Sequence, residues 1–182
     1  MRLWTRESAR SAPFNCDRWR TLKPTATREA IALAGAAYAH DIYTATLVAD
    51  LETAADTLLA YDIYPPQRMR AHVCTANGRV ALGATIVQRI SLSLAVVETA
   101  VRVVEFESAA DRAYFAYATL PGHVERGLAA FEVRATDSGV TMKIETWSQP
   151  GHWLATLGRP LTRRLQRQAA EEAIAWFSAS VA

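Results

Sequence analysis

Three side chains that can exchange protons or bind charged groups are crowded into one short segment: His123, Glu125 and Arg126. Pro121-Gly122, just before them, is a strong turn signal. A histidine titrates near neutral pH, so His123 can act as an acid or a base, with Glu125 to orient it. The three together could bind or protonate a ligand. The alternative is a solvated hairpin tip with a surface ion pair that contributes little. We predict His123 and Glu125 as catalytic residues and Arg126 as a substrate-binding residue.

The elements that position this segment fit within one domain. The chain has 182 residues, of which 51% are hydrophobic and 21% are charged, enough apolar residues for a sizeable core. Its net charge of +2 is too small to indicate a nucleic-acid partner. Residues 1–26 mix Arg, Ser, Pro and Trp without periodicity, and we predict an extended arm there. Residues 27–182 form the predicted domain.

The two cysteines, Cys16 and Cys74, are far apart and show neither metal-site nor disulfide spacing, which suits a reducing compartment. The first residues lack the apolar run of a secretory signal. The longest apolar region, 30–49, is interrupted by His40 and Asp41 and is too polar in the middle to span a membrane. We therefore expect a cytoplasmic protein without membrane contact, and a homodimer is left open.

Hydrophobic periodicity predicts strands and helices in a definite order. Ala-rich residues 27–38 predict a short helix. Asp50 is a good N-cap for a second short helix, whose apolar positions follow at helical spacing, and Pro65-Pro66 stops it. Asn77-Gly78 is the best short hairpin signal. The predicted strands are 41–49, 70–76, 79–90, 94–107, 112–120, 126–135 and 139–147.

The spacing of the hydrophobic residues changes again in the last third of the chain. Residues 153–157 predict one or two helical turns, and from Leu161 apolar residues recur every three or four positions to form a long closing helix. An antiparallel sheet has one face to bury, and such a helix can bury it. The pattern predicts an α+β fold in which a curved antiparallel sheet of about six or seven strands wraps around the C-terminal helix, the helix-grip arrangement.

Two segments resemble a known family. Residues 102–104 and 114–127 (YFAYATLPGHVERG) look like its first signature, and residues 147–167 (WSQPGHWLATLGRPLTRRLQR) look like its second. The family is uncharacterised protein family (UPF) 0548, also called domain of unknown function nineteen-ninety, and the resemblance spans roughly residues 38–178. Ala118 and Val124 stand where its pattern has glycine and proline. The layout is also similar to the START/polyketide-cyclase (SRPBCC) superfamily, which implies a cavity for a hydrophobic ligand.

Further residues could bind such a ligand. Tyr64 and Tyr117 offer hydroxyl groups in an apolar setting, and Trp153 offers a ring to stack on, although each is also an ordinary core or anchoring residue. Phe131 follows the loop in an aromatic-rich segment. Met142 shares an apolar strand face that should point inward, which would leave Glu145 outside. We predict all of these except Glu145 as substrate-binding residues.

No Gly-rich phosphate loop, Cys/His metal cluster or nucleophile elbow is present, so we expect no cofactor and no metal. The leading hypothesis is a cofactor-independent cyclase or isomerase of a polyketide-like molecule. One alternative is a non-catalytic carrier or sensor of a lipid-like ligand. Another is a structural module whose core is filled by side chains.

Overall fold

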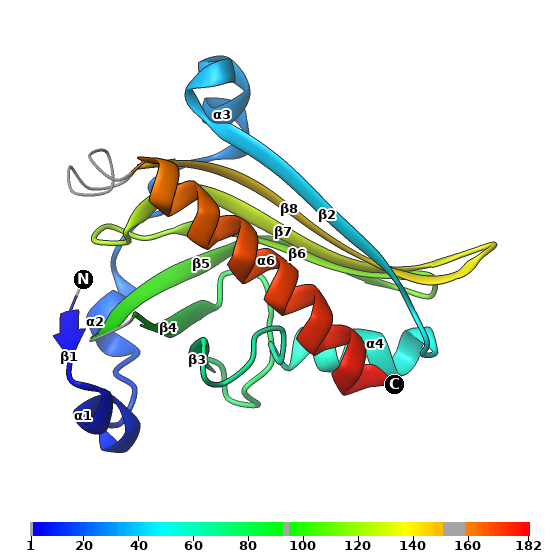
Figure 1. Cartoon of the computed structure of the whole chain (residues 1–182), viewed down its shortest axis with the longest axis horizontal. Coiled ribbons are helices and arrows are strands. Elements are labelled where there is room, and N and C mark those ends of the chain that lie inside the picture. Colours follow the sequence, from blue (N-terminus) through cyan, green and yellow to red (C-terminus); the bar gives the residue numbers. More distant parts are fainter. Residues whose placement is uncertain (1, 93–94, 151–158) are drawn as a thin grey trace.

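The computed structural model describes residues 2–92, 95–150 and 159–182 and shows a curved sheet with a long helix across one face (Figure 1). The strands are β1 (Arg2–Trp4), β2 (Ala39–Leu47), β3 (Met69–Val73), β4 (Thr85–Ser91), β5 (Val96–Ala109), β6 (Arg112–Thr119), β7 (Glu125–Thr136) and β8 (Gly139–Pro150). The helices are α1 (Arg6–Ser11), α2 (Asp17–Arg20), α3 (Arg28–Ala34), the 3-10 turn η1 (Gly35–Ala37), α4 (Leu51–Leu59) and α6 (Arg159–Val181).

The sheet is antiparallel and has the order β2-β8-β7-β6-β5-β4-β3, with β1 paired to β5. α6 and α4 cover its concave face (Figure 1). The predicted helix-grip fold is therefore confirmed. Asp50 caps α4 as expected, because its Oδ1 accepts a hydrogen bond of 2.8 Å from the Thr53 amide. None of the helices in the described ranges is long and apolar enough to cross a bilayer.

The strand predicted over 79–90 begins only at Thr85, and Asn77-Gly78 lies within a longer connection from β3 to β4. The cause is a tertiary contact. Val80 is buried in the core, and its amide donates a hydrogen bond of 2.8 Å to the Leu59 carbonyl at the end of α4. Because this contact attaches the segment around Val80 to α4, the segment does not extend β4 toward its N-terminal end.

Alternation along the strands divides their residues between the two faces of the sheet. Phe115 of β6, Phe131 of β7 and Met142 of β8 are fully buried on the concave side, beneath Phe177 of α6. Val140 and Ile144 share the face of Met142, as predicted. Glu145 lies on the other face, where it pairs with His40 and Lys143.

The N-terminal arm covers the convex face of β4, β5 and β6. It holds β1, α1 and α2 rather than one extended segment. Trp19 of α2 is 2% exposed and packs against Val87, Ala100 and Leu120. Below the arm, Arg89 and Glu98 form a buried ion pair of 2.9 Å. The Arg89 guanidinium also donates hydrogen bonds to three carbonyl oxygens of the arm, those of Ala9, Ala12 and Pro13.

A disulfide joins Cys16 of the arm to Cys74 beside β3. The spacing of the two cysteines did not indicate a disulfide, and the structure corrects that interpretation. Their separation of 58 residues carries no pairing signal, because docking of the arm on the sheet is what brings them together.

Gly127 provides a test of the fold at the start of β7. Its φ is +156°, and a Cβ there would lie 1.9 Å from the Trp147 carbonyl oxygen of β8. We expect Gly127→Ala to lower the free energy of unfolding by at least about 3 kcal/mol, since backbone must move. Gly78→Ala is the control: it has φ +69° and nothing within 4 Å, so only about 1–2 kcal/mol should be lost. Urea denaturation measures both, and equal losses would contradict the close strand approach.

Candidate functional site

The loop between β6 and β7 is held by its own hydrogen bonds. Gly122 has φ +87°, and the His123 amide donates to the Leu120 carbonyl at 3.1 Å. This is a type II turn with Pro121 and Gly122 in its two central positions. The His123 Nδ1 accepts a hydrogen bond of 3.1 Å from the Glu125 amide. Burial lowers the pKa of His123 to about 4, so the ring is neutral at pH 7 and fastens the loop.

Neighbouring residues of the loop then diverge to opposite faces of the sheet. The Glu125 carboxylate lies on the concave side and accepts a hydrogen bond from Gln166 of α6. The same Gln166 amide donates to the Ser148 hydroxyl at 3.2 Å. Arg126 instead donates to the carbonyl of Thr25, at 3.3 Å, where the chain leaves the arm. The structure thus brings the half-buried Glu125 to the concave side and leaves the exposed Arg126 outside it.

Three tyrosines gather on the concave side, near the segment that follows α4. The ring centroid of Tyr61 is 6.4 Å from that of Tyr64 and 6.5 Å from that of Tyr117. Burial raises the pKa of all three phenols, and the charge of Glu125 raises those of Tyr64 and Tyr117 further. Hydrogen bonding from Tyr61 and Tyr64 lowers the pKa of Tyr117, but burial outweighs it. All three groups therefore remain protonated and can donate hydrogen bonds near neutral pH.

Tyr61 is held in an unusual conformation. Its φ is +61°, a region that residues with a side chain seldom occupy. Its hydroxyl accepts a hydrogen bond of 2.7 Å from the Gln88 side chain of β4, a contact that lies within the buried core. Local strain of this kind persists where the surroundings fix it, and it is concentrated at functional sites.

Thr99 adds a hydroxyl group that has no partner within the described residues. It lies on β5 directly opposite Gln88, so both side chains are on the same face of the sheet. Its side chain is completely buried. A buried hydroxyl without a hydrogen bond is costly, and such groups in native proteins call for an explanation. A ligand atom or a bound water at this position would supply the missing bond.

An apolar floor continues from the polar groups. The rings of Phe115 and Phe131 are stacked with centroids 5.1 Å apart, and the centroid of Tyr117 is 5.4 Å from that of Phe131. Met142 lies buried in the same cluster. The interior therefore offers aromatic surface with a few hydrogen-bonding groups at one end, the usual composition of a small-molecule site.

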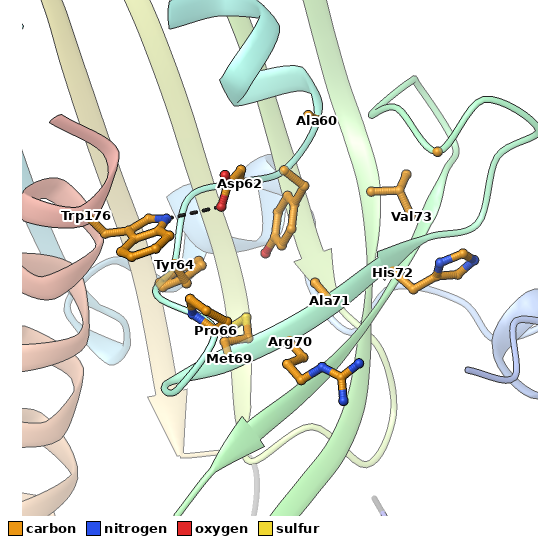
Figure 2. Close-up of a pocket in the computed structure, with 12 residues that line it drawn as sticks. Ala60, Asp62, Tyr64, Pro66, Met69, Arg70, Ala71, His72, Val73 and Trp176 are labelled. Carbon is orange, nitrogen blue, oxygen red and sulfur yellow. Dashed lines mark hydrogen bonds between the residues drawn. The ribbon is translucent and has the colours of Figure 1, made fainter. Parts of the chain in front are cut away.

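A hollow of about 510 Å³ opens beside this cluster, between β3 and the segment after α4 (Figure 2). Tyr61, Tyr64, Met69 and Trp176 are among the residues that line it. Trp176 of α6 donates a hydrogen bond of 3.1 Å to Asp62, which links the helix to the rim. Tyr61 and Tyr64 line the hollow and also belong to the tyrosine cluster, so the hollow adjoins that cluster.

The structure thus gathers four of the predicted ligand-site residues on the concave side: Tyr64, Tyr117, Phe131 and Met142. Glu125 joins them, whereas His123 stays in the loop and Arg126 turns outward. Trp153 lies outside the described residues. Sequence reasoning missed Gln88 and Thr99 and did not select Tyr61. The sequence carries no clear signal for either Gln88 or Thr99, because each strand has other polar residues, among them Arg89 beside Gln88 and Glu98 beside Thr99.

These features define a protein with the helix-grip fold and a small polar cluster under its long helix. The chain belongs to the family described as Domain of unknown function (DUF1990), whose model matches residues 24–175. No curated protein matches it in sequence.

Solved structures share the fold at low identity. The hypothetical protein jhp0584 from Helicobacter pylori is 10% identical, with a TM-score of 0.59 over 94% of this chain and 95% of its own. The di-domain ARO/CYC StfQ from the steffimycin biosynthetic pathway is 13% identical, with a TM-score of 0.60 over 79% of this chain and 50% of its own. Major latex-like protein 151 from Panax ginseng is 9% identical, with a TM-score of 0.55 over 80% of this chain and 98% of its own.

The depressed pKa of His123 gives a test of its place in the loop. We expect its ring protons to titrate in NMR with a midpoint near pH 4. Since the ordinary value of 6.5 applies to the unfolded chain, His123 contributes stability above pH 6.5 that is lost as the pH falls toward 4, by up to about 3 kcal/mol. The free-energy difference between native protein and His123→Ala should shrink accordingly. A midpoint near 6.5 would show a solvated histidine.

Proposed function

We propose that the protein binds a hydrophobic small molecule bearing a carbonyl or hydroxyl group and acts on it as a cofactor-independent cyclase or isomerase. The proposed ligand lies between α6 and the concave face of the sheet, against Phe131 and Met142. The observation that carries the proposal is the buried Thr99 hydroxyl without a partner, opposite Gln88 and near the tyrosine cluster. A ligand oxygen there would satisfy a group that the fold leaves unsatisfied.

The polar groups suit proton transfer next to a carbonyl. In the proposed reaction, the Glu125 carboxylate removes a proton from the carbon beside a substrate carbonyl. The protonated phenols of Tyr117 and its neighbours donate hydrogen bonds to the enolate oxygen that forms. Return of the proton to a different carbon gives an isomer. Attack of the enolate carbon on a second carbonyl closes a ring, and the new alkoxide takes the proton back from Glu125. Neither route needs a co-reactant.

The hollow beside β3 gives the proposed ligand a route to the interior. Tyr61 and Tyr64 lie at the boundary between the hollow and the polar cluster. The fold likeness to a protein whose name places it in a biosynthetic pathway agrees with a polyketide-like substrate, although folds of this kind host many functions.

A carrier of a lipid-like ligand is the second candidate, and one contact favours it. Gln166 already holds the Glu125 carboxylate with a hydrogen bond, so the group is engaged before any substrate arrives.

The expected cytoplasmic location also stays a prediction, and the redox state of Cys16 and Cys74 in freshly isolated protein tests it.

Thr99→Val separates ligand binding from stability. Because it removes a buried hydroxyl without a partner, we expect it to raise the free energy of unfolding by about 1 kcal/mol, while a ligand that co-purifies with the native chain is held about three- to tenfold less tightly. Native mass spectrometry and urea denaturation measure the two effects. Thr44→Val, on the exposed side of β2, is the matched control. Loss of stability together with unchanged ligand retention would contradict a ligand at Thr99.

Glu125→Gln distinguishes the enzyme from the carrier. The amide cannot accept a proton, so conversion of the co-purified molecule in a single-turnover assay should fall at least about a hundredfold. Ligand retention should change little, since Gln fills the same volume. If both conversion and retention are unaffected, Glu125 is not the base; if no conversion occurs even in the native chain, the carrier function stands.

A further inference from the structure

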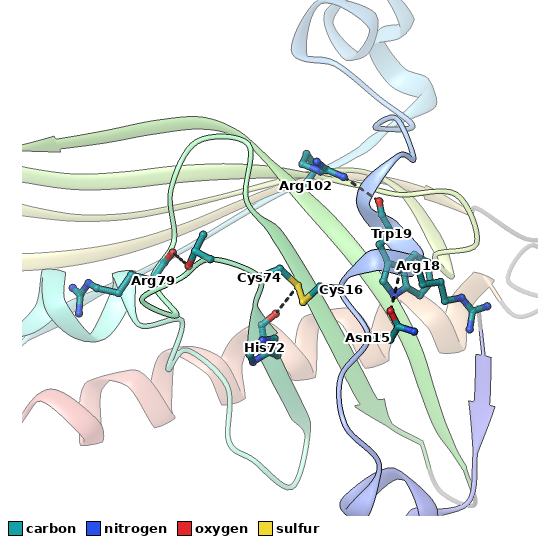
Figure 3. The surroundings of a disulfide bond; sticks show 9 residues. Asn15, Cys16, Arg18, Trp19, His72, Cys74, Arg79 and Arg102 are labelled. Carbon is teal, nitrogen blue, oxygen red and sulfur yellow. Dashed lines mark hydrogen bonds between the residues drawn. A yellow bond between two sulfur atoms is a disulfide. The ribbon is translucent and has the colours of Figure 1, made fainter.

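We propose a second site, at the junction of the arm and the sheet, that binds one Zn²⁺ or a similar thiol-loving divalent cation when Cys16 and Cys74 are reduced. His72 is the third ligand. The ligand atoms of these three residues lie within 4.8 Å of one another. Figure 3 shows the disulfide and His72 between β3 and the arm. The site is independent of the proposed reaction, because it lies on the opposite side of the sheet from Tyr117 and Glu125.

Strand geometry puts two of the ligands together. His72 and Cys74 are two positions apart at the end of β3, so their side chains extend to the same side of the strand, while Val73 between them is buried in the core. Cys16 approaches from the turn just before α2. Two thiolates and one imidazole are ligands that Zn²⁺ prefers, and three protein ligands leave a fourth tetrahedral position for water.

The His72 ring is oriented and available. It stacks on Phe14 of the arm, with ring centroids 5.5 Å apart and planes 17° apart. Within the described part of the chain, neither of its ring nitrogens has a hydrogen-bond partner, and the side chain is exposed. A ring fixed by stacking, with a free nitrogen beside two sulfur atoms, can bind a cation at little entropic cost.

The ligands stay close when the disulfide is reduced, because other contacts hold the arm. Trp19 is buried three residues beyond Cys16. Arg102 of β5 donates a hydrogen bond of 3.0 Å to the Trp19 carbonyl, and Arg89 binds the chain on the other side of Cys16 through the Pro13 carbonyl at 2.9 Å. These attachments bracket Cys16 on both sides, so its thiol remains opposite β3.

The site and the disulfide exclude each other, since both use the same sulfur atoms. Oxidation of the loaded site by a peroxide balances as follows. The two thiolates lose two electrons and form the disulfide, hydrogen peroxide takes up those electrons and two protons to become two waters, and the cation is released.

Co²⁺ is the probe that tests the proposal. We expect the full chain, reduced with a phosphine, to bind one Co²⁺ and to show the charge-transfer absorption of thiolate ligands, which added Zn²⁺ abolishes. His72→Ala should weaken Zn²⁺ binding by more than about tenfold. His40→Ala is the matched control, because His40 is also exposed and stacked, in its case on Trp147. Near-UV circular dichroism reports whether the arm stays docked after reduction.

Any one of four results would overturn the proposal. The first is absence of the charge-transfer band in the reduced chain while the arm remains docked. The second is release of the arm on reduction, since the ligand set would then be lost. The third is Zn²⁺ affinity in His72→Ala that equals that of His40→Ala. Cys16→Ser/Cys74→Ser, which keeps the shape of both side chains, should show no band, and a band in that variant would equally count against the site.

Discussion

The structure depends on one constraint: successive residues of a strand face opposite sides, and over β4 to β6 both sides of the sheet are covered. Toward α6, alternation collects Phe115, Phe131 and Met142 into an apolar floor beneath the tyrosine cluster. Toward the arm, it collects Arg89 and Glu98 into an ion pair that has almost no contact with water. The same rule separates Glu125 from Arg126, so two adjacent charged residues serve different faces. The titratable groups that are close together in the sequence of the β6–β7 loop are therefore separated in the folded protein.

Periodicity sufficed to predict the fold because most strands bury one face more deeply than the other. The strand 139–147 alternated clearly, and its inward face with Met142 was placed correctly. β4 gave no such signal, since residues on both its faces are buried, and Gln88 could not be assigned to a side. The start of β4 was misplaced because a contact between Val80 and the end of α4 decides it. Long-range contacts of this kind leave no trace in local pattern.

The candidate site was predicted in part for a related reason. The aromatic residues and Glu125 could be predicted as site residues from their type alone, because aromatic rings and a carboxylate are recognisable within hydrophobic segments. Thr99 is an ordinary strand residue in sequence, and its significance arises only from its neighbours. The cysteine pair was missed in the same way: the proximity of Cys16 to Cys74 and His72 is a property of arm docking. Chemistry assembled from distant segments becomes visible only in three dimensions.

The buried ion pair between Arg89 and Glu98 also bears on the order in which the sheet forms and the arm docks during folding. Glu98 lies only 9 residues from Arg89, and the two strands that carry them are adjacent hairpin partners, whereas Ala9 is 80 residues away. Closing the short loop costs much less entropy than closing the long one. We therefore expect the pair to form first, in contact with water, and to be buried only when the arm docks. Although the arm is synthesised before the sheet, we expect it to be among the last parts to dock, with Trp19 exposed until β4 to β6 have assembled.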